Sequence, residues 1–136
     1  MHVARLAFAG LAWVLVGLIV LQVFWVGMAL FAGGGFALHR DFGYLVSGVP
    51  LLVLGAAFFA RPGSRILGLV AGLFVITFLQ TVLPVLRADL PIVAALHPPT
   101  ALLIFWLSLV VARRATALAR MPAVAAEVPP EAVRSA

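Results

Sequence analysis

Two histidines with the same polar neighbours recur in the chain at one fixed spacing. The motif LQ is followed after fourteen residues by the motif ALH, and both motifs occur twice. Imidazole ligates metals, exchanges protons and forms hydrogen bonds, so a matched pair predicts a two-nitrogen site. We expect four side chains to carry whatever chemistry the chain performs: Gln22, His39, Gln80 and His97.

The elements that position these residues are too apolar for a water-soluble domain. Of the 136 residues, 65% are hydrophobic and 10% are charged, whereas soluble domains carry about a quarter charged residues. A backbone in lipid must satisfy its own hydrogen bonds, and helices do so. We predict an all-α integral membrane protein with a four-helix transmembrane domain over residues 1–114. Its spans are predicted at about 6–32, 38–60, 66–86 and 96–113, with a flexible tail over 115–136.

The two halves of the chain are predicted to be parallel repeats. Shifting the sequence by 58 residues superposes Gln22 on Gln80 and His39 on His97. Each half holds one outgoing and one returning helix, so a pseudo-twofold axis runs along the membrane normal of an up-down four-helix bundle. The second and fourth helices are then diagonal, and both histidines lie at equal depth.

Prolines modify this symmetry. Pro50 and Pro84 fall inside spans and predict kinks. Pro98 and Pro99 follow His97, which favours an N-cap position for that histidine and predicts a ring direction different from that of His39.

The arginines predict the orientation. Only Arg40 and Arg87 fall on one side of the predicted bundle. The other side holds Arg5, Arg61, Arg65, Arg113, Arg114, Arg120 and Arg134. By the positive-inside rule both termini are cytoplasmic and the histidines lie near the outer face. The net charge of +5 reflects this topology and needs no nucleic-acid partner, and the absence of cysteine excludes thiolate chemistry.

Two facing imidazoles at equal depth in an apolar bundle are what axial ligation of a haem iron requires. Gly43 and Ala101 lie one helical turn after the histidines and leave room for a flat macrocycle. A helix N-terminus disfavours protonation, which keeps each ring able to bind metal. Arg40 and Arg87, at the outer edge, are suited to bind haem propionates.

Gln22 and Gln80 are expected to face the bundle interior, because a polar amide is costly in hydrocarbon. They bond each other, a main-chain carbonyl freed by a proline, or the edge of a ligand. The tryptophans, Trp25 among them, are interpreted as lipid-facing or packing residues.

Other interpretations of the histidines stay open. They are a structural pair, or part of a substrate, proton or metal-ion site. Asp41 and Asp89 would complete a set of four zinc ligands with them, but these two residues do not fall at matching places in the repeat, which argues against zinc. An enzyme is disfavoured because Ser47 and Ser108 have no paired base. No span carries an acidic residue in its core, which argues against proton pumping.

The segments ALHRDFGYL and ALHPPTALLIF, each preceded by LQ, resemble a family of small four-helix bacterial membrane proteins of unknown function. That resemblance covers roughly residues 5–115. The helix order and histidine placement are also similar to one half of haem A synthase, which implies His39 and His97 as axial haem ligands. Haem A synthesis is not implied, because the chain has one four-helix unit and no clear counterpart of the synthase-type glutamate.

The sequence therefore predicts a haem b protein of the bacterial cytoplasmic membrane, acting in one-electron transfer or haem carriage rather than as an enzyme. Its partner would be a quinone or another membrane redox protein. Two alternatives from other classes are a cofactor-free accessory subunit of a larger membrane complex and a small-molecule carrier.

Overall fold

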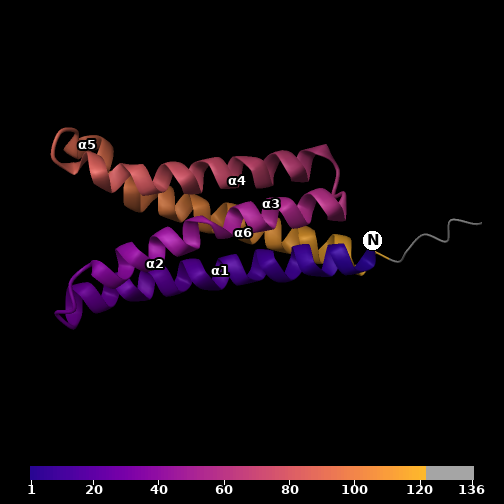
Figure 1. Cartoon of the computed structure of the whole chain (residues 1–136), viewed down its shortest axis with the longest axis horizontal. Helices are drawn as coiled ribbons and strands as arrows, with labels where there is room; N and C mark the ends of the chain where they lie inside the picture. The colour runs from indigo at the N-terminus through magenta and orange to yellow at the C-terminus, as the bar shows by residue number, and fades with distance from the viewer. Residues whose placement is uncertain (122–136) are drawn as a thin grey trace, which may run out of the picture.

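The computed structural model describes residues 1–121, and every regular element in that range is a helix (Figure 1). The helices form four antiparallel rods, and each is long and apolar enough to cross a membrane. The first rod is α1 (His2–Phe31), and the second joins α2 (Ala37–Ser47) to α3 (Val49–Ala60). The third joins α4 (Ser64–Val82) to the 3-10 helix η1 (Leu83–Arg87). The fourth consists of the single turn α5 (Pro91–Ala94) followed by α6 (His97–Arg120).

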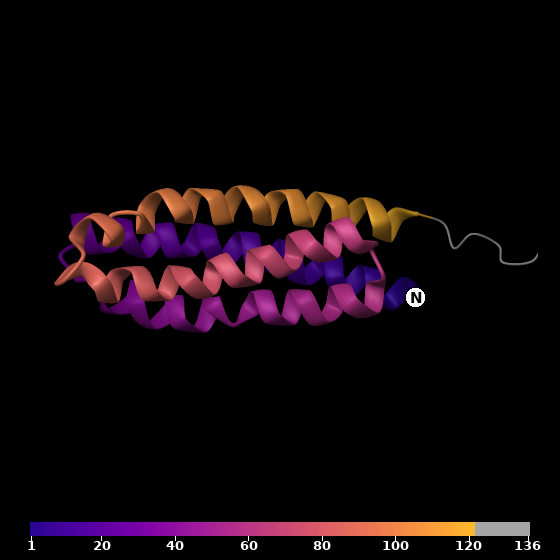
Figure 2. The same cartoon turned by 90° about the horizontal axis from the view of Figure 1, so that it is seen from above.

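The rods pack in ring order. The most extensive contacts join α1 to α6 and to α3, and α4 to the same two helices. The rod formed by α2 and α3 therefore lies diagonally opposite α6, as an up-down bundle requires. Seen from above, the four rods run side by side along one long axis (Figure 2). The predicted all-α, four-span architecture is confirmed, whereas the pseudo-twofold repeat stays a prediction.

Two prolines interrupt the helices where kinks were predicted. Pro50 lies at the start of α3 and has no N–H to donate, so the second rod breaks at Gly48. The Gly48 N–H closes a tight turn on the Leu45 carbonyl at 3.2 Å. Pro84 likewise stands near the start of η1, where the third rod changes from α to 3-10 geometry.

The bundle has two unlike ends. We call the end that contains Met1, the α3–α4 turn and the last turn of α6 the arginine end. The opposite end, with the α1–α2 turn and α5, is the histidine end. Helix α6 continues to Arg120, beyond the predicted limit at 113, so residues 115–120 of the predicted flexible tail are helical, and residues 122–136 lie outside the described part of the chain.

The tightly packed core lies toward the arginine end. Its largest fully buried apolar side chains are Phe8, Leu15, Val53, Val70, Leu73 and Val111. Toward the histidine end α2 contributes only Val46 to the buried set, and Figure 1 shows the rods diverging there.

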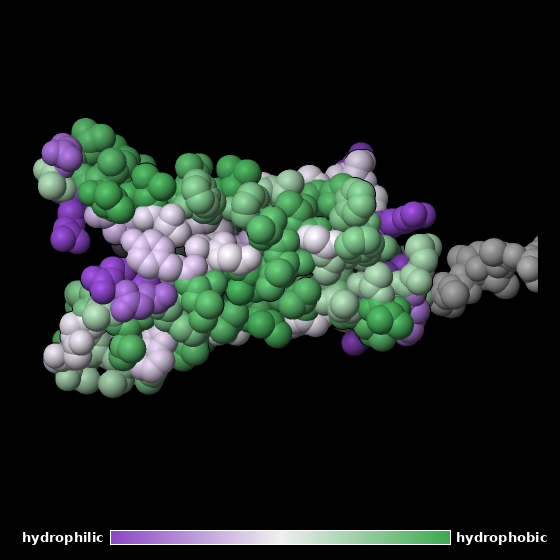
Figure 3. Space-filling view, in the orientation of Figure 1, coloured by the Kyte–Doolittle hydropathy of each residue, from purple (hydrophilic) through white to green (hydrophobic). Residues whose placement is uncertain are grey.

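The outer surface is apolar along most of the length of the bundle. Val14 is 52% exposed and Val75 is 53% exposed, although both lie in the middle of long helices. Figure 3 shows apolar side chains over most of the length, with hydrophilic ones gathered at the two ends. An exposed apolar band bounded by polar ends is the surface that a bilayer solvates.

Candidate functional site

The two histidines meet at the histidine end. His39 is the third residue of α2 and His97 is the first residue of α6, and both are half-buried. The centroids of their rings are 6.1 Å apart and the ring planes are nearly perpendicular, at 86°. Diagonal elements of the bundle thus bring together two imidazoles that are far apart in the sequence.

Each imidazole is held through the same nitrogen by the same kind of atom. His39 Nδ1 donates to the main-chain carbonyl of Gln22 at 3.2 Å, and His97 Nδ1 donates to that of Gln80 at 3.1 Å. A carbonyl oxygen only accepts, so Nδ1 carries the proton and Nε2 of each neutral ring keeps its lone pair. Two free Nε2 lone pairs therefore lie in one small region.

The predicted N-cap position of His97 was wrong. His97 opens α6 with Leu96 as its N-cap, and the prolines after it are accommodated in the first turn. The ring direction is set by the Gln80 carbonyl rather than by the local backbone of His97. The two rings consequently make equivalent hydrogen bonds.

The Gln80 side chain fastens the start of α6 to α4. Its Nε2 donates to the main-chain carbonyl of His97 at 2.7 Å, and its Oε1 accepts from the Thr100 hydroxyl. Both polar atoms of the amide are thereby satisfied. The glutamines do not bond each other, and the carbonyl that Gln80 reaches is not one that a proline has freed.

The Gln22 side chain is placed differently. Its Oε1 is buried and finds no hydrogen-bond partner among residues 1–121. A Cβ added at Gly43 would lie 2.6 Å from Gln22 Nε2, so the missing side chain of Gly43 makes room for this amide. The space predicted for a macrocycle at Gly43 is filled by Gln22 in the present conformation.

A second unpartnered polar atom lies one helical turn from Gln22. Trp25 Nε1 is buried and has no acceptor within the part of the chain that the structure describes. Residues three apart lie on the same face of a helix. A free acceptor and a free donor therefore stand together on α1 beside the site.

The remaining predicted site residues lie at the margins. Ala101 is half-buried one turn after His97, whereas Arg40 and Arg87 are exposed. Arg40 Nε donates to Asp41 Oδ1 at 2.8 Å in a solvated pair, a geometry that stabilises proteins little. Their predicted role toward propionates stays a prediction.

The residues present limit the chemistry of the site. Within residues 1–121 no three His, Asp, Glu or Cys side chains lie close enough to hold a metal ion, so the proposed zinc set of His39, Asp41, Asp89 and His97 does not assemble. Ser108 Oγ donates to the Ile104 carbonyl at 2.8 Å, a local bond typical of a membrane-helix serine. The site offers two nitrogen ligands for a metal. A metal bound there would need its remaining donor atoms from a bound group rather than from these side chains.

Two residues of the site were missed in the sequence. Thr100 completes the Gln80 network, but its repeat partner Phe42 has no hydroxyl, so the repeat did not draw attention to it. Trp25 was interpreted as a packing residue because tryptophan is common in membrane helices. Its position one turn after Gln22 was the signal available.

Fold and site together define a four-span membrane protein with a paired-imidazole site. Residues 22–87 match DUF6220, a family of unknown function, which confirms the predicted similarity to such a family. The matched segment contains Gln22, His39, Gly43 and Gln80 and ends before His97. No curated protein and no solved structure matches the chain.

Proposed function

We propose that the protein binds one haem b between His39 and His97 and acts in one-electron transfer or haem carriage within a membrane. The observation that carries the proposal is the pair of rings with both Nδ1 atoms bonded to main-chain carbonyls and both Nε2 atoms without a hydrogen-bond partner among residues 1–121. Haem supplies four nitrogens to its iron and needs two more, and an iron with two imidazole ligands cycles between ferrous and ferric states.

The ring spacing fits this ligand pair. Metal–imidazole bonds of about 2.0–2.1 Å, with about 1 Å from each nitrogen to its ring centre, place two axial rings roughly 6 Å apart. The observed separation of the centroids is 6.1 Å. The angle between the ring planes is no obstacle, because two imidazoles on opposite sides of one metal can bind it at any angle between their planes.

The opening of the bundle also fits a flat group. His39 belongs to the hairpin of α1 and α2, and His97 belongs to the hairpin of α4 and α6. These hairpins diverge at the histidine end, and the space-filling surface is hollowed between them (Figure 3). His39 and His97 would hold such a group from opposite hairpins.

Unpartnered polar atoms give further support. Trp25 Nε1 is a buried donor of the kind that a carboxylate accepts, and the Gln22 amide presents either a donor or an acceptor when it rotates. Displacement of the Gln22 amide from Gly43 would open space beside His39 without breaking a protein hydrogen bond to its Oε1.

The segments around His39 and His97 resemble those of bacterial membrane proteins, which supports a location in a bacterial cytoplasmic membrane. The arginine distribution supports an orientation with both termini on the cytoplasmic side. The histidine end then faces outward, where a membrane quinone or another redox protein would exchange electrons.

The test is the absorption spectrum of the full chain purified in mild detergent from haem-replete cells, oxidised and then reduced with dithionite. Sharp reduced α and β bands are expected, and they should be lost in His39→Ala and in His97→Ala. His2→Ala is the matched control, because His2 is an exposed histidine at the arginine end and its loss should leave the bands intact.

A colourless, fully helical protein that takes up no added haemin would overturn the proposal. The histidines would then serve only to join α2 to α1 and α6 to α4, as the cofactor-free accessory subunit requires. Bands that survive both alanine substitutions would place the haem elsewhere.

A further inference from the structure

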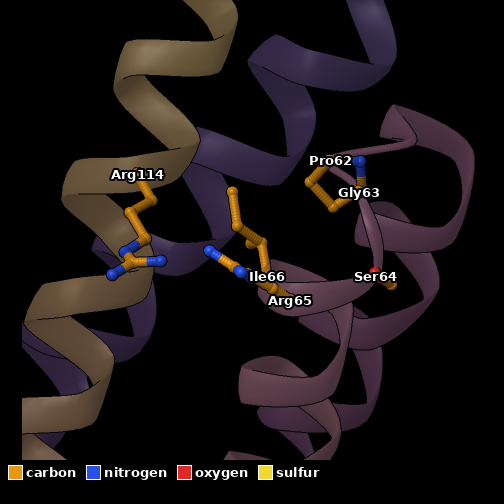
Figure 4. Close-up of a pocket in the computed structure, with 6 residues that line it drawn as sticks. All are labelled: Pro62, Gly63, Ser64, Arg65, Ile66 and Arg114. Carbon is orange, nitrogen blue, oxygen red and sulfur yellow. The ribbon is translucent and has the colours of Figure 1, made fainter.

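The arginine end carries a cationic hollow that the paired histidines do not involve. It lies where the α3–α4 turn meets α6 and has a volume of about 410 Å³ (Figure 4). Its lining includes the side chains of Arg65 and Arg114, the turn residues Pro62 and Gly63, and Ser64. Because a water molecule occupies about 30 Å³, this volume accommodates a group the size of a phosphate with its attached glycerol.

Two guanidinium groups converge on this hollow, and neither is paired with a carboxylate within residues 1–121. Figure 4 shows Arg65 reaching from α4 and Arg114 from α6 toward the same space. The acidic residues of the described chain, Asp41 and Asp89, both lie at the histidine end, and Arg40–Asp41 is the ion pair formed within residues 1–121. Like charges that converge repel each other, so an anion between them is favourable.

The start of α4 adds main-chain donors to the same hollow. The N–H groups of Ser64, Arg65 and Ile66 precede the first intrahelical bond, which Leu67 N–H makes to the Gly63 carbonyl at 3.0 Å. Free N–H groups and the positive end of a helix complement the two guanidinium groups as phosphate ligands.

An apolar hollow of about 540 Å³ adjoins the cationic one and shares Pro62, Ile66 and Arg114 with it. Its other lining residues are Ala117, Leu118 and Met121. The combined surface is therefore cationic on one side and apolar on the other. It lies at the arginine end, next to the exposed apolar surface of the spans, and the phosphates of a bilayer likewise flank its hydrocarbon core.

We propose that this surface binds the headgroup of an anionic phospholipid, with Arg65 and Arg114 on the phosphodiester. A free phosphate ion would match the guanidinium groups but would gain nothing from the apolar hollow. Basic pockets between membrane helices on the cytoplasmic side are typical sites for anionic headgroups. The proposal depends on the membrane-spanning fold and is independent of the haem proposal.

The test uses the full chain in detergent micelles supplemented with phosphatidylcholine, titrated with phosphatidylglycerol and followed by native mass spectrometry and thermal unfolding. Phosphatidylglycerol is expected to bind and to raise the melting temperature. Arg65→Gln or Arg114→Gln should weaken binding about fivefold, and the double variant about thirtyfold, equivalent to ~2 kcal/mol.

Arg113→Gln is the matched control. Arg113 is an exposed neighbour of Arg114 on α6 but lines neither hollow, so its loss should change the affinity less than about twofold if the pocket, rather than the general surface charge, binds the lipid. Helicity and melting temperature in phosphatidylcholine alone show whether each variant is folded.

Three outcomes would overturn the proposal. Equal weakening by Arg113→Gln would mean that the surface potential, not the hollow, attracts the lipid. Equal binding of additional phosphatidylcholine would remove the requirement for an anion. Equal stabilisation by inorganic phosphate at the same concentration would identify a free-anion site.

Discussion

The two hairpins hold their histidines alike but hold their glutamines differently. In both, a histidine Nδ1 donates to the main-chain carbonyl of a glutamine seventeen residues earlier. The Gln80 amide is satisfied at both ends, by His97 and Thr100, whereas Gln22 Oε1 is buried without a partner in the described chain. The Gln80 side of the site is therefore fully hydrogen-bonded, whereas the Gln22 side keeps a buried oxygen without a partner among residues 1–121.

This difference indicates which half of the site rearranges when a group binds. The α4–α6 hairpin already satisfies its polar groups, so moving Gln80 would break two hydrogen bonds. Moving the Gln22 amide breaks none that its Oε1 makes and relieves a buried unsatisfied group. A bound group is therefore expected to be accommodated by rearrangement on the α1–α2 side, while His97 stays fixed.

The largest expected effect tests the equivalence of the histidines. Both rings donate through Nδ1 to a main-chain carbonyl, so the two histidines should be equivalent ligands. His39→Ala and His97→Ala should each lower haemin affinity by more than ~100-fold, beyond the range typical of residues that only support a ligand. Haemin titration measures this, and added imidazole should restore the reduced bands by replacing the missing ring. Loss in only one variant would show that the second histidine is not a ligand.

The next effect separates the glutamines. Gln80→Leu removes two hydrogen bonds in the membrane and should lower the free energy of unfolding by about 1–3 kcal/mol. Gln22→Leu removes an amide with an unsatisfied oxygen and should leave the stability unchanged or raise it by up to about 1 kcal/mol. SDS titration of the micelle-bound protein, followed by circular dichroism, measures both variants.

Neither glutamine substitution should alter the histidine tautomers, because the carbonyl that holds each Nδ1 belongs to the main chain. The reduced haem bands should therefore persist in Gln22→Leu and Gln80→Leu. Equal destabilisation by the two substitutions would contradict the asymmetry, and it would mean that Gln22 has a partner in the membrane.

The sequence predicted the spans and the meeting of His39 and His97, because hydropathy, proline and repeat position are properties of the chain itself. It did not predict that each histidine Nδ1 donates to a main-chain carbonyl, since such a carbonyl accepts a hydrogen bond whatever residue carries it. The different fates of the glutamines depend on Thr100 and on the backbone approach at Gly43. Both are tertiary contacts, which the hydropathy pattern and repeat spacing of the sequence do not reveal.

A smaller effect is expected when Gln80 Oε1 loses its partner and becomes unpaired, as Gln22 Oε1 is among residues 1–121. Thr100→Val keeps the branched shape and removes the hydroxyl that donates to Gln80 Oε1. The change should cost about 0.6 kcal/mol, the average for an interhelical hydrogen bond in a membrane, and at most about 1.7 kcal/mol. SDS unfolding measures this cost.

The hydroxyl of Thr100 also lies 2.7 Å from the Leu96 carbonyl, within its own helix. A double-mutant cycle with Gln80→Leu separates the two bonds, because Thr100→Val should cost less once Gln80 is absent. An unchanged cost would assign the whole effect to the Leu96 bond and would leave Gln80 Oε1 without a partner of consequence.

The smallest expected effect concerns Gly43, whose repeat partner is Ala101. In Gly43→Ala the new Cβ meets the end of a flexible side chain, Gln22 Nε2, which can turn away. Alanine favours a helix over glycine by about 0.5–1 kcal/mol, so the net change in unfolding free energy should lie within about 1 kcal/mol of zero. The reciprocal Ala101→Gly should lose about 0.5–1 kcal/mol, because it gains no new contact. A loss above about 2 kcal/mol in Gly43→Ala would show that the Gln22 amide is fixed, and the α1–α2 hairpin would then be as rigid as its counterpart.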